Sequence, residues 1–252
     1  MPPSSPPGSA RRADQPRTPP PLRLLGEARV LWELPRLLVS APRLARAPRG
    51  NGEHVLVLPG YGASDASTRV LRDYLRLLGY RPHPWGLGRN TGSVGRLLPR
   101  VIERLERIAG RDGPVFLVGW SLGGYLAREA ARDRPKLVRH VVTLGSPVVG
   151  GPKYTAVASR YRRQGFDLDA IEAKVEARYA RPLRVPVTAI YSKTDGVVDW
   201  RACIDRRSPD VRHVEVSSTH LGLGFSPDVY AIIAASLARR SSRPLRSRAK
   251  SA

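Results

Sequence analysis

Between residues 54 and 238, short apolar runs alternate with segments of helical periodicity. The helical segments are residues 66–78, 93–109, 122 to about 134 and about 227–238. The apolar runs are residues 54–60, 81–87, 114–120, 139–145, 185–192 and 211–218. Apolar runs separated by helices predict parallel strands joined by crossover helices. The expected fold class is therefore α/β, a doubly wound, mostly parallel sheet with helices on both faces.

One stretch, residues 148–184, interrupts this alternation and holds no run typical of a strand. A single amphipathic helix is expected within it, from Asp167 to Tyr179. We interpret the stretch as a short helical cap inserted into the sheet domain.

A further helix is predicted before the first strand, over residues 22–41, with a break or kink at Pro35. At 100° per residue, its apolar and charged residues lie on opposite sides. The apolar side holds Leu24, Leu25, Ala28, Leu31, Trp32, Leu38 and Val39, and the charged side holds Arg23, Glu27, Arg29, Glu33 and Arg36. Such a basic amphipathic helix either packs on the body of the protein, which we favour, or lies on an anionic membrane surface. A linker follows, from Pro42 to Gly52.

The two ends of the chain differ in composition from the rest. Residues 1–21 are rich in Pro and residues 239–252 are rich in Arg and Ser, so both are predicted to be disordered. The predicted organisation is then a helical segment with its linker at 22–49 and a folded domain at 50–238 that includes the cap.

The N-terminus lacks the apolar core of a secretory signal, and no apolar run is long enough to span a bilayer. We therefore expect a cytoplasmic protein, with peripheral membrane contact left open.

The net charge of +22 invites a nucleic-acid or membrane function, but its distribution weakens that interpretation. Twelve of these charges lie in residues 1–49 and 238–252, outside the predicted domain. Most of the basic residues are Arg, which is typical of GC-rich codon usage, so we attribute most of the excess to that bias and to solvation and expect no specific nucleic-acid binding. The lone cysteine, Cys203, excludes a disulfide framework within the chain, and no Cys/His cluster indicates a metal site. No cofactor is expected.

The strongest chemical motif is GWSLGG at residues 119–124. It follows an apolar strand and precedes a helix, which is the context of a nucleophile elbow. A sharp turn there lifts the hydroxyl of Ser121 above the sheet, and the small residues around it let strand and helix approach. Ser121 is therefore the candidate nucleophile.

A serine nucleophile requires a base and an orienting carboxylate. Asp195 and His220 follow the last two predicted strands, in the order acid then histidine, and are the candidates. Asp199 is the alternative acid, although we expect it to cap a helix. The other four histidines lie at strand starts or inside strands, at the wrong end for such a site: His54, His83, His140 and His213.

The oxyanion of the reaction needs two backbone N–H groups. Leu122, directly after the nucleophile, is expected to supply one. Tyr61, in the glycine-containing loop after the first strand, is expected to supply the other.

Five segments together resemble the α/β-hydrolase superfamily, and most closely its bacterial lipase and esterase-like branch. They are LPGYGAS, GWSLGG, TLGSPVVGG, YSKTDGVVDW and STHLGLG, within residues 54–238. The third segment departs from many lipases at Val148, where those enzymes often have His. The resemblance implies a Ser121, His220 and Asp195 triad on an α/β-hydrolase fold.

Three functions are compatible with these residues. The first is hydrolysis of a carboxylic ester, with an acyl or lipid-like substrate, through an acyl-enzyme. The second is acyl transfer or thioester hydrolysis by the same triad. The third is a basic binding protein on a hydrolase scaffold, because a fold alone does not establish activity. We favour the first.

Overall fold

The computed structural model describes residues 15–241 and contains one six-stranded parallel sheet. Its strands are β1 (His54–Leu58), β2 (Arg81–Pro84), β3 (Val115–Trp120), β4 (Val138–Leu144), β5 (Val187–Tyr191) and β6 (Val211–Glu215). They are ordered β2-β1-β3-β4-β5-β6, and every neighbouring pair is parallel. The predicted α/β class and parallel sheet are confirmed.

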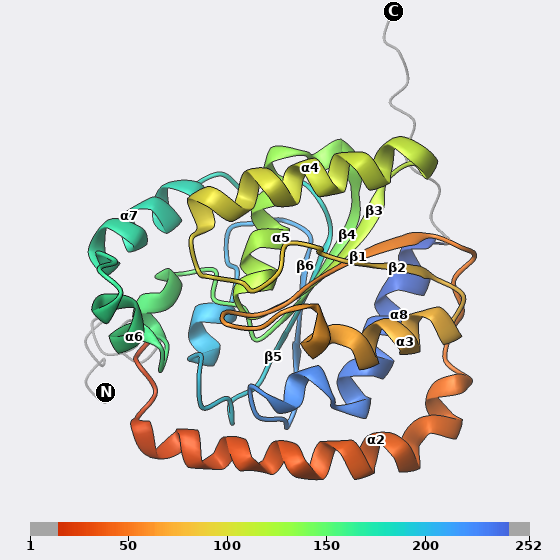
Figure 1. Ribbon diagram of the computed structural model, residues 1–252, viewed down its shortest axis with the longest axis horizontal. Helices are drawn as coiled ribbons and strands as arrows, with labels where there is room; N and C mark the ends of the chain where they lie inside the picture. The colour runs from red at the N-terminus through yellow and green to blue at the C-terminus, as the bar shows by residue number, and fades with distance from the viewer. Residues whose placement is uncertain (1–14, 242–252) are drawn as a thin grey trace, which may run out of the picture.

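Helices cover both faces of the sheet (Figure 1). The elements on one face are α4 (Val94–Asp112) and α5 (Leu122–Asp133), and those on the other are α3 (Arg69–Leu77) and α8 (Pro227–Ser241). The sequence of β1 shows why: Leu56 and Leu58 enter the core with α4 and α5, whereas Val55 and Val57 enter the opposite core. Burial on both faces produces the continuous apolar run that the sequence displays.

The predicted cap is helical and short. It contains η4 (Gly151–Tyr154), α6 (Ala158–Arg163) and α7 (Leu168–Tyr179). Asp167 begins α7, because its carboxylate accepts hydrogen bonds from the backbone N–H groups of Asp169 and Ala170. A bridge between Thr155 and Val198 fastens the start of the cap to the loop after β5.

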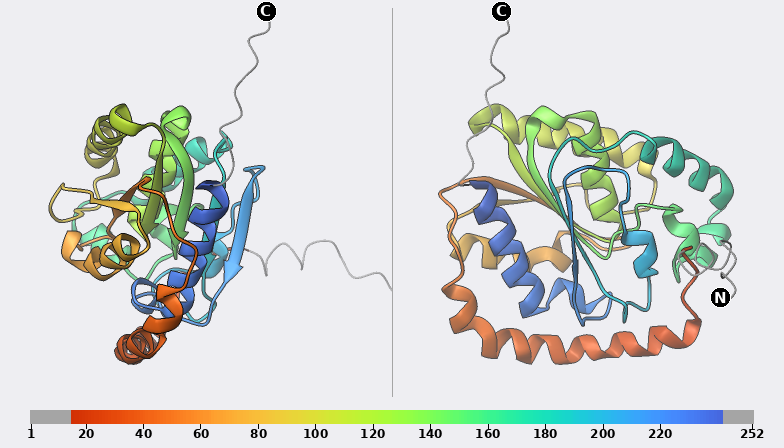
Figure 2. Two further views of the ribbon diagram at one scale, coloured as in Figure 1. Left: turned by 90° about the vertical axis from the view of Figure 1, so that its right-hand side faces the viewer. Right: turned by 180° about the vertical axis from the view of Figure 1, so that it is seen from behind.

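Before the first strand lie the 3₁₀ segment η1 (Pro21–Arg29) and the long helix α2 (Val30–Ala45). The predicted break at Pro35 is wrong: α2 continues through Pro35 and Pro42, so the predicted linker is shorter than expected. The helix runs along one edge of the molecule and packs outside α8 (Figures 1 and 2).

The helix α2 packs on the body, but through its polar side. Glu33 of α2 and Glu27 of the preceding η1 are buried, whereas the apolar residues of the opposite side are exposed. The salt bridge from Arg36 to Asp228 (2.9 Å) and the burial of Leu44 complete the attachment. The favoured interpretation, a helix packed on the body, is thus confirmed. The side that packs is the charged one, and the apolar side faces outward.

The predicted disordered ends lie mostly outside the described residues, which exclude 1–14 and 242–252. Two parts that are described differ from the prediction. Residues 15–20 contact the body, since the Arg17 N–H donates to Asp199 and the Thr18 hydroxyl donates to the Lys153 carbonyl. Helix α8 extends to Ser241, beyond the predicted boundary at residue 238. Within residues 15–241, none of the helices combines the length and the apolar composition that a membrane span requires.

Candidate active site

Ser121 occupies a strained turn between β3 and α5. Its φ of 54° and ψ of −123° make it the one non-glycine residue with positive φ in residues 15–241. A side chain in this region of φ and ψ is costly and is held only by surrounding structure. Here the backbone N–H of Ser121 donates to the carbonyl of Leu144 at the end of β4 (2.7 Å). The turn expected for a nucleophile elbow is therefore present.

Glycines make this turn sterically possible. A Cβ on Gly123 would collide with the carbonyl oxygen of Leu58, and a Cβ on Gly119 would collide with the backbone of Gly124. The GWSLGG motif thus brings the start of α5 against the ends of β1 and β3.

The two predicted oxyanion donors lie on either side of the point where the strand order reverses. Tyr61 follows β1 and Leu122 follows β3, and these neighbouring strands send their helices to opposite faces. Such a switch point opens a crevice beyond the strand ends. Within the described chain no carbonyl accepts either N–H. Both residues line the same pocket as Ser121.

Asp195 and His220 meet beyond the ends of β5 and β6. His220 Nδ1 lies 2.7 Å from Asp195 Oδ2, and both side chains are buried. The other carboxylate oxygen, Oδ1, accepts the backbone N–H groups of Val197 (2.8 Å) and Val198 (2.7 Å). These bonds orient the carboxylate toward the imidazole.

Charge around His220 favours its protonated form. Burial alone lowers the pKa of His220, but the charge of Asp195, their hydrogen bond and the charge of Glu27 together outweigh burial and raise the pKa. An imidazole with such neighbours is a stronger base than a solvated one.

Trp120, the residue directly before Ser121, connects the turn of the candidate nucleophile to the loop of the candidate base. The indole N–H of Trp120 donates to the carbonyl of His220 (3.1 Å), which ties the histidine loop to the residue before Ser121. Among the described hydrogen bonds, none joins Ser121 Oγ to His220. Contacts of this kind often tighten only when substrate binds.

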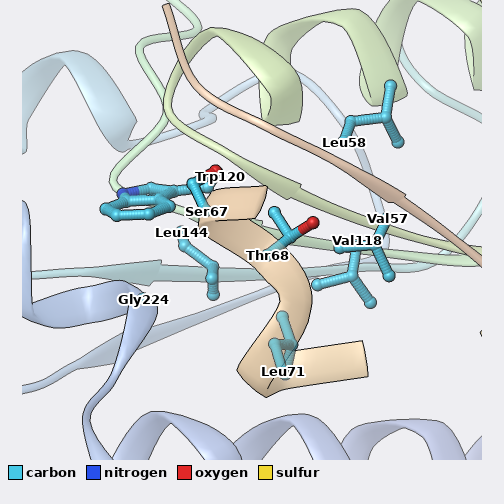
Figure 3. Close-up of a pocket in the computed structure, with 9 residues that line it drawn as sticks. All are labelled: Val57, Leu58, Ser67, Thr68, Leu71, Val118, Trp120, Leu144 and Gly224. Atoms are coloured by element: carbon cyan, nitrogen blue, oxygen red, sulfur yellow. The ribbon is translucent and has the colours of Figure 1, made fainter. Parts of the chain in front are cut away.

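The Trp120 ring packs in the core rather than in the substrate crevice. Figure 3 shows the ring in a pocket that Thr68, Leu71, Leu144 and Gly224 also line. The volume of this pocket is about 10 Å³. That volume is about the smallest that holds one water molecule, so no substrate fits there. Trp120 therefore supports the His220 loop.

A larger pocket, about 690 Å³, lies between the body and the cap. Its floor includes Ser121, Leu122 and Tyr125, and its roof includes Tyr161 of α6 and Val175 of α7. The volume is within the range of small-molecule sites, and the lining is mainly apolar. The pocket is suited to a chain-like apolar group.

Glu27 is a site residue that the sequence analysis missed. Its Oε1 accepts the backbone N–H groups of Gly196 (2.8 Å) and His220 (3.0 Å), and its Oε2 accepts that of Leu221 (2.7 Å). One buried carboxylate thus joins the loop of Asp195 to the loop of His220. No local pattern signals this role, because the partners lie 169 to 194 residues away.

Gly145, at the end of β4, was also not singled out. Its φ is 54°, and a Cβ there would lie 3.0 Å from Asp195 Oδ2 and 3.1 Å from His220 Nδ1. A side chain at this position would press on the acid and base. The TLGSP segment could have indicated this residue, because its glycine directly follows a predicted strand.

The alternative candidates have other roles. Asp199 accepts the backbone N–H of Arg201 and begins η5 (Trp200–Cys203), so it acts as a cap. The remaining histidines contact groups away from Ser121: His54 lies 2.6 Å from both His83 and Asp112, His140 lies 3.0 Å from Thr188, and His213 accepts the N–H of Asp205.

Two curated proteins are similar to this chain in sequence. A stretch of 138 residues is 35% identical to polyketide synthase ThaQ of Burkholderia thailandensis, covering 49% of this chain but only 6% of that protein. Mouse mitochondrial palmitoyl-protein thioesterase ABHD10 is 26% identical over 208 residues, which is 68% of this chain and 69% of ABHD10.

Solved structures share the fold. Mouse ABHD10 matches with a TM-score of 0.55 and 20% identity, over 76% of this chain and 90% of that one. A structure of the metagenome-derived lipolytic enzymes LipS and LipT matches with a TM-score of 0.60 and 17% identity, over 78% and 96% of the two chains. The family model for the alpha/beta hydrolase fold matches residues 42–170, just over half of the chain. The chain therefore belongs to the α/β-hydrolase fold family.

Proposed function

We propose that this chain is a serine hydrolase that cleaves an acyl ester through a covalent acyl-enzyme on Ser121. One observation carries the proposal: a serine held in a strained turn shares the carboxyl edge of the sheet with a buried, hydrogen-bonded Asp195 and His220 pair. Few structural reasons exist for maintaining both features, whereas serine hydrolysis requires them.

In the proposed cycle, Ser121 Oγ attacks the carbonyl carbon while His220 accepts the serine proton. The N–H groups of Tyr61 and Leu122 stabilise the oxyanion. His220 then protonates the leaving alcohol, and the ester bond breaks. Water attacks the acyl-enzyme with His220 as base, which releases the acid and restores Ser121. Asp195 holds the imidazole tautomer and stabilises the imidazolium.

The acyl group is proposed to occupy the apolar pocket beneath the cap. Thioesters are a second candidate class, favoured by the similarity to a palmitoyl-protein thioesterase. The same acyl-enzyme would form, with a thiol leaving in place of an alcohol. An acyltransferase would use this intermediate too, with an alcohol or amine replacing water in the second step.

The test is a Ser121→Ala variant assayed with p-nitrophenyl butyrate and a fluorophosphonate label. We expect turnover to fall by about a thousandfold or more and labelling to disappear. Ser93→Ala is the matched control, because Ser93 also lines the pocket but lies before α4 and has no capping bond. Turnover retained in Ser121→Ala would refute the proposal. Comparing acyl-thioester with oxyester turnover, and analysing products with added alcohols, separates the three reactions.

A further inference from the structure

Six large apolar side chains line the outward face of η1 and α2. We call them the apolar strip: Leu22, Leu25, Leu31, Trp32, Leu38 and Val39, each between 72% and 83% exposed. A spacing of three in the 3₁₀ segment (Leu22 to Leu25) and of seven in the α-helix (Leu31 to Leu38, Trp32 to Val39) aligns them along one side. A surface helix normally turns this side inward. A contiguous exposed strip of this kind marks an interaction surface.

The inward side of the same helix prevents the strip from turning toward the core. Glu27 is held by three backbone N–H groups, and Glu33 accepts the hydroxyl of Ser218 (2.8 Å). Arg36 bridges Asp228 of α8. Rotating the helix would break these bonds and expose buried carboxylate partners. The strip therefore stays exposed in the folded protein.

The surroundings of the strip are positively charged. Residues 15–49 contain seven arginines and two acidic residues, and both acidic residues, Glu27 and Glu33, are buried. Arg23, Arg29 and Arg46 are exposed beside the strip. An anionic surface complements this arrangement. A second copy of the chain would instead bring the same positive charges together, which disfavours a symmetric dimer through this face.

The strip also begins next to the pocket. The chain just before η1 contacts the cap, where the Thr18 hydroxyl donates to the carbonyl of Lys153. The neighbouring Pro152 lines the pocket. Figure 1 shows η1 starting below the cap helices α6 and α7, with α2 continuing along the edge of the molecule. A surface that covers the strip would thus lie beside the cap.

We propose that the apolar strip docks the protein on the surface of an anionic lipid bilayer. The helix lies in the plane of the interface, its apolar side chains enter the acyl region, and the flanking arginines contact lipid phosphates. This site is separate from Ser121, and its test does not require the protein to be a hydrolase.

The test is co-sedimentation of the full chain with vesicles of phosphatidylcholine containing about a third phosphatidylglycerol. We expect wild-type binding, and binding about tenfold weaker in Leu31→Asn/Trp32→Gln, since two apolar side chains leave the interface. Leu77→Asn is the matched control: Leu77 is also an exposed leucine, on α3, and binding should not change. Circular dichroism melting of each variant checks that the fold is retained.

A second readout uses the fluorescence of Trp32, which should shift to shorter wavelength with anionic vesicles and lose that shift in Trp32→Phe. Of the other tryptophans, Trp85 and Trp120 are buried and Trp200 is half-buried against Tyr191, so Trp32→Phe measures the background that these three contribute. The proposal is overturned if wild-type protein does not bind, if pure phosphatidylcholine binds it equally well, or if the double variant binds as wild type. A wild-type dimer that the double variant dissociates, without vesicle binding, also overturns it.

Discussion

The carboxylate of Glu27 accepts the backbone N–H of His220 at 3.0 Å, although the two residues are 193 positions apart. The same carboxylate accepts the N–H groups of Gly196 and Leu221, so it holds both loops that carry the candidate acid and base. Its charge also contributes to the raised pKa of His220. Position and protonation of the base therefore depend on a residue from the N-terminal segment.

The first prediction concerns Glu27→Gln. An amide has one acceptor oxygen in place of two, so at least one buried N–H loses its partner. We therefore expect the free energy of unfolding to decrease by about 2 kcal/mol. Misplacement of the base should lower kcat/KM by about tenfold to a hundredfold. Removing the negative charge should also lower the pKa of His220 and move the acid limb of the kcat/KM profile to lower pH.

Glu33→Gln is the control for this prediction. Glu33 of α2 is as buried as Glu27 of η1, but its partners are the Ser218 hydroxyl and Arg36 rather than backbone N–H groups of the loops that carry Asp195 and His220. We expect this variant to lose stability with an unchanged acid limb. If both variants gave the same pH profile, Glu27 would have only a structural role.

A second prediction concerns the dependence of stability on pH. The pKa of His220 is raised in the folded state, so its protonation contributes stability that is fully present below about pH 6.5 and is lost as pH rises through the folded-state pKa. Asp195→Asn removes the largest source of that rise. The denaturant midpoint of wild type, relative to that of Asp195→Asn, should therefore decrease as the pH rises above about 6.5. A constant difference would contradict the coupling.

A third prediction isolates the strain at Ser121. Glycine adopts positive φ without cost, whereas alanine keeps the strained backbone. We expect Ser121→Gly to be more stable than Ser121→Ala by about 1 kcal/mol in urea denaturation, with neither variant active. Equal midpoints would mean that the turn stores no strain.

A fourth prediction tests the acyl pocket with a matched pair on α7. Ala177 lines the pocket, and Ala173, one turn earlier, does not. Ala177→Trp should lower kcat/KM for long-chain p-nitrophenyl esters by about tenfold and leave acetate turnover nearly unchanged. Ala173→Trp should alter neither. A uniform loss across chain lengths in Ala177→Trp would place the acyl chain elsewhere.

The fifth prediction concerns Cys203. Burial, with smaller contributions from Asp195 and Asp199, raises the pKa of this thiol well above its usual value, so thiolate is scarce. We expect no reaction with iodoacetamide in the native protein and complete reaction in urea, measured by mass spectrometry. Rapid labelling of the native protein would show that the region after β5 opens frequently.

The sheet could be predicted from the sequence because its central strands are buried on both faces, and such strands appear as uninterrupted apolar runs. The prediction was least accurate for the two edge strands, because β6 ends at Glu215 rather than at residue 218 and β2 ends at Pro84 rather than at residue 87. As an edge strand, β2 tolerates Pro82 and Pro84, and the chain then turns where Asp65 accepts the N–H groups of Trp85 and Gly86.

The meeting of Asp195 and His220 was also predictable, because the carboxyl ends of parallel strands lie at one edge of the sheet. The face of α2 that packs on the body could not be predicted from the sequence. Sequence polarity assigns glutamates to solvent, and only the folded loops supply the N–H groups that make burying Glu27 and Glu33 favourable. Which of two faces is covered depends on partners far along the chain, so helical periodicity alone leaves it undetermined.

The placement of Glu27 bears on where the catalytic unit starts. Similarity to the family begins at residue 42, and the first strand begins at His54, so either boundary would be a natural choice for trimming or transplanting the domain. A chain cut at either point would keep Ser121, Asp195 and His220 yet lose the carboxylate that joins the loops of the last two. The smallest fragment that keeps both loops joined therefore includes η1, which lies before the residues that match the family.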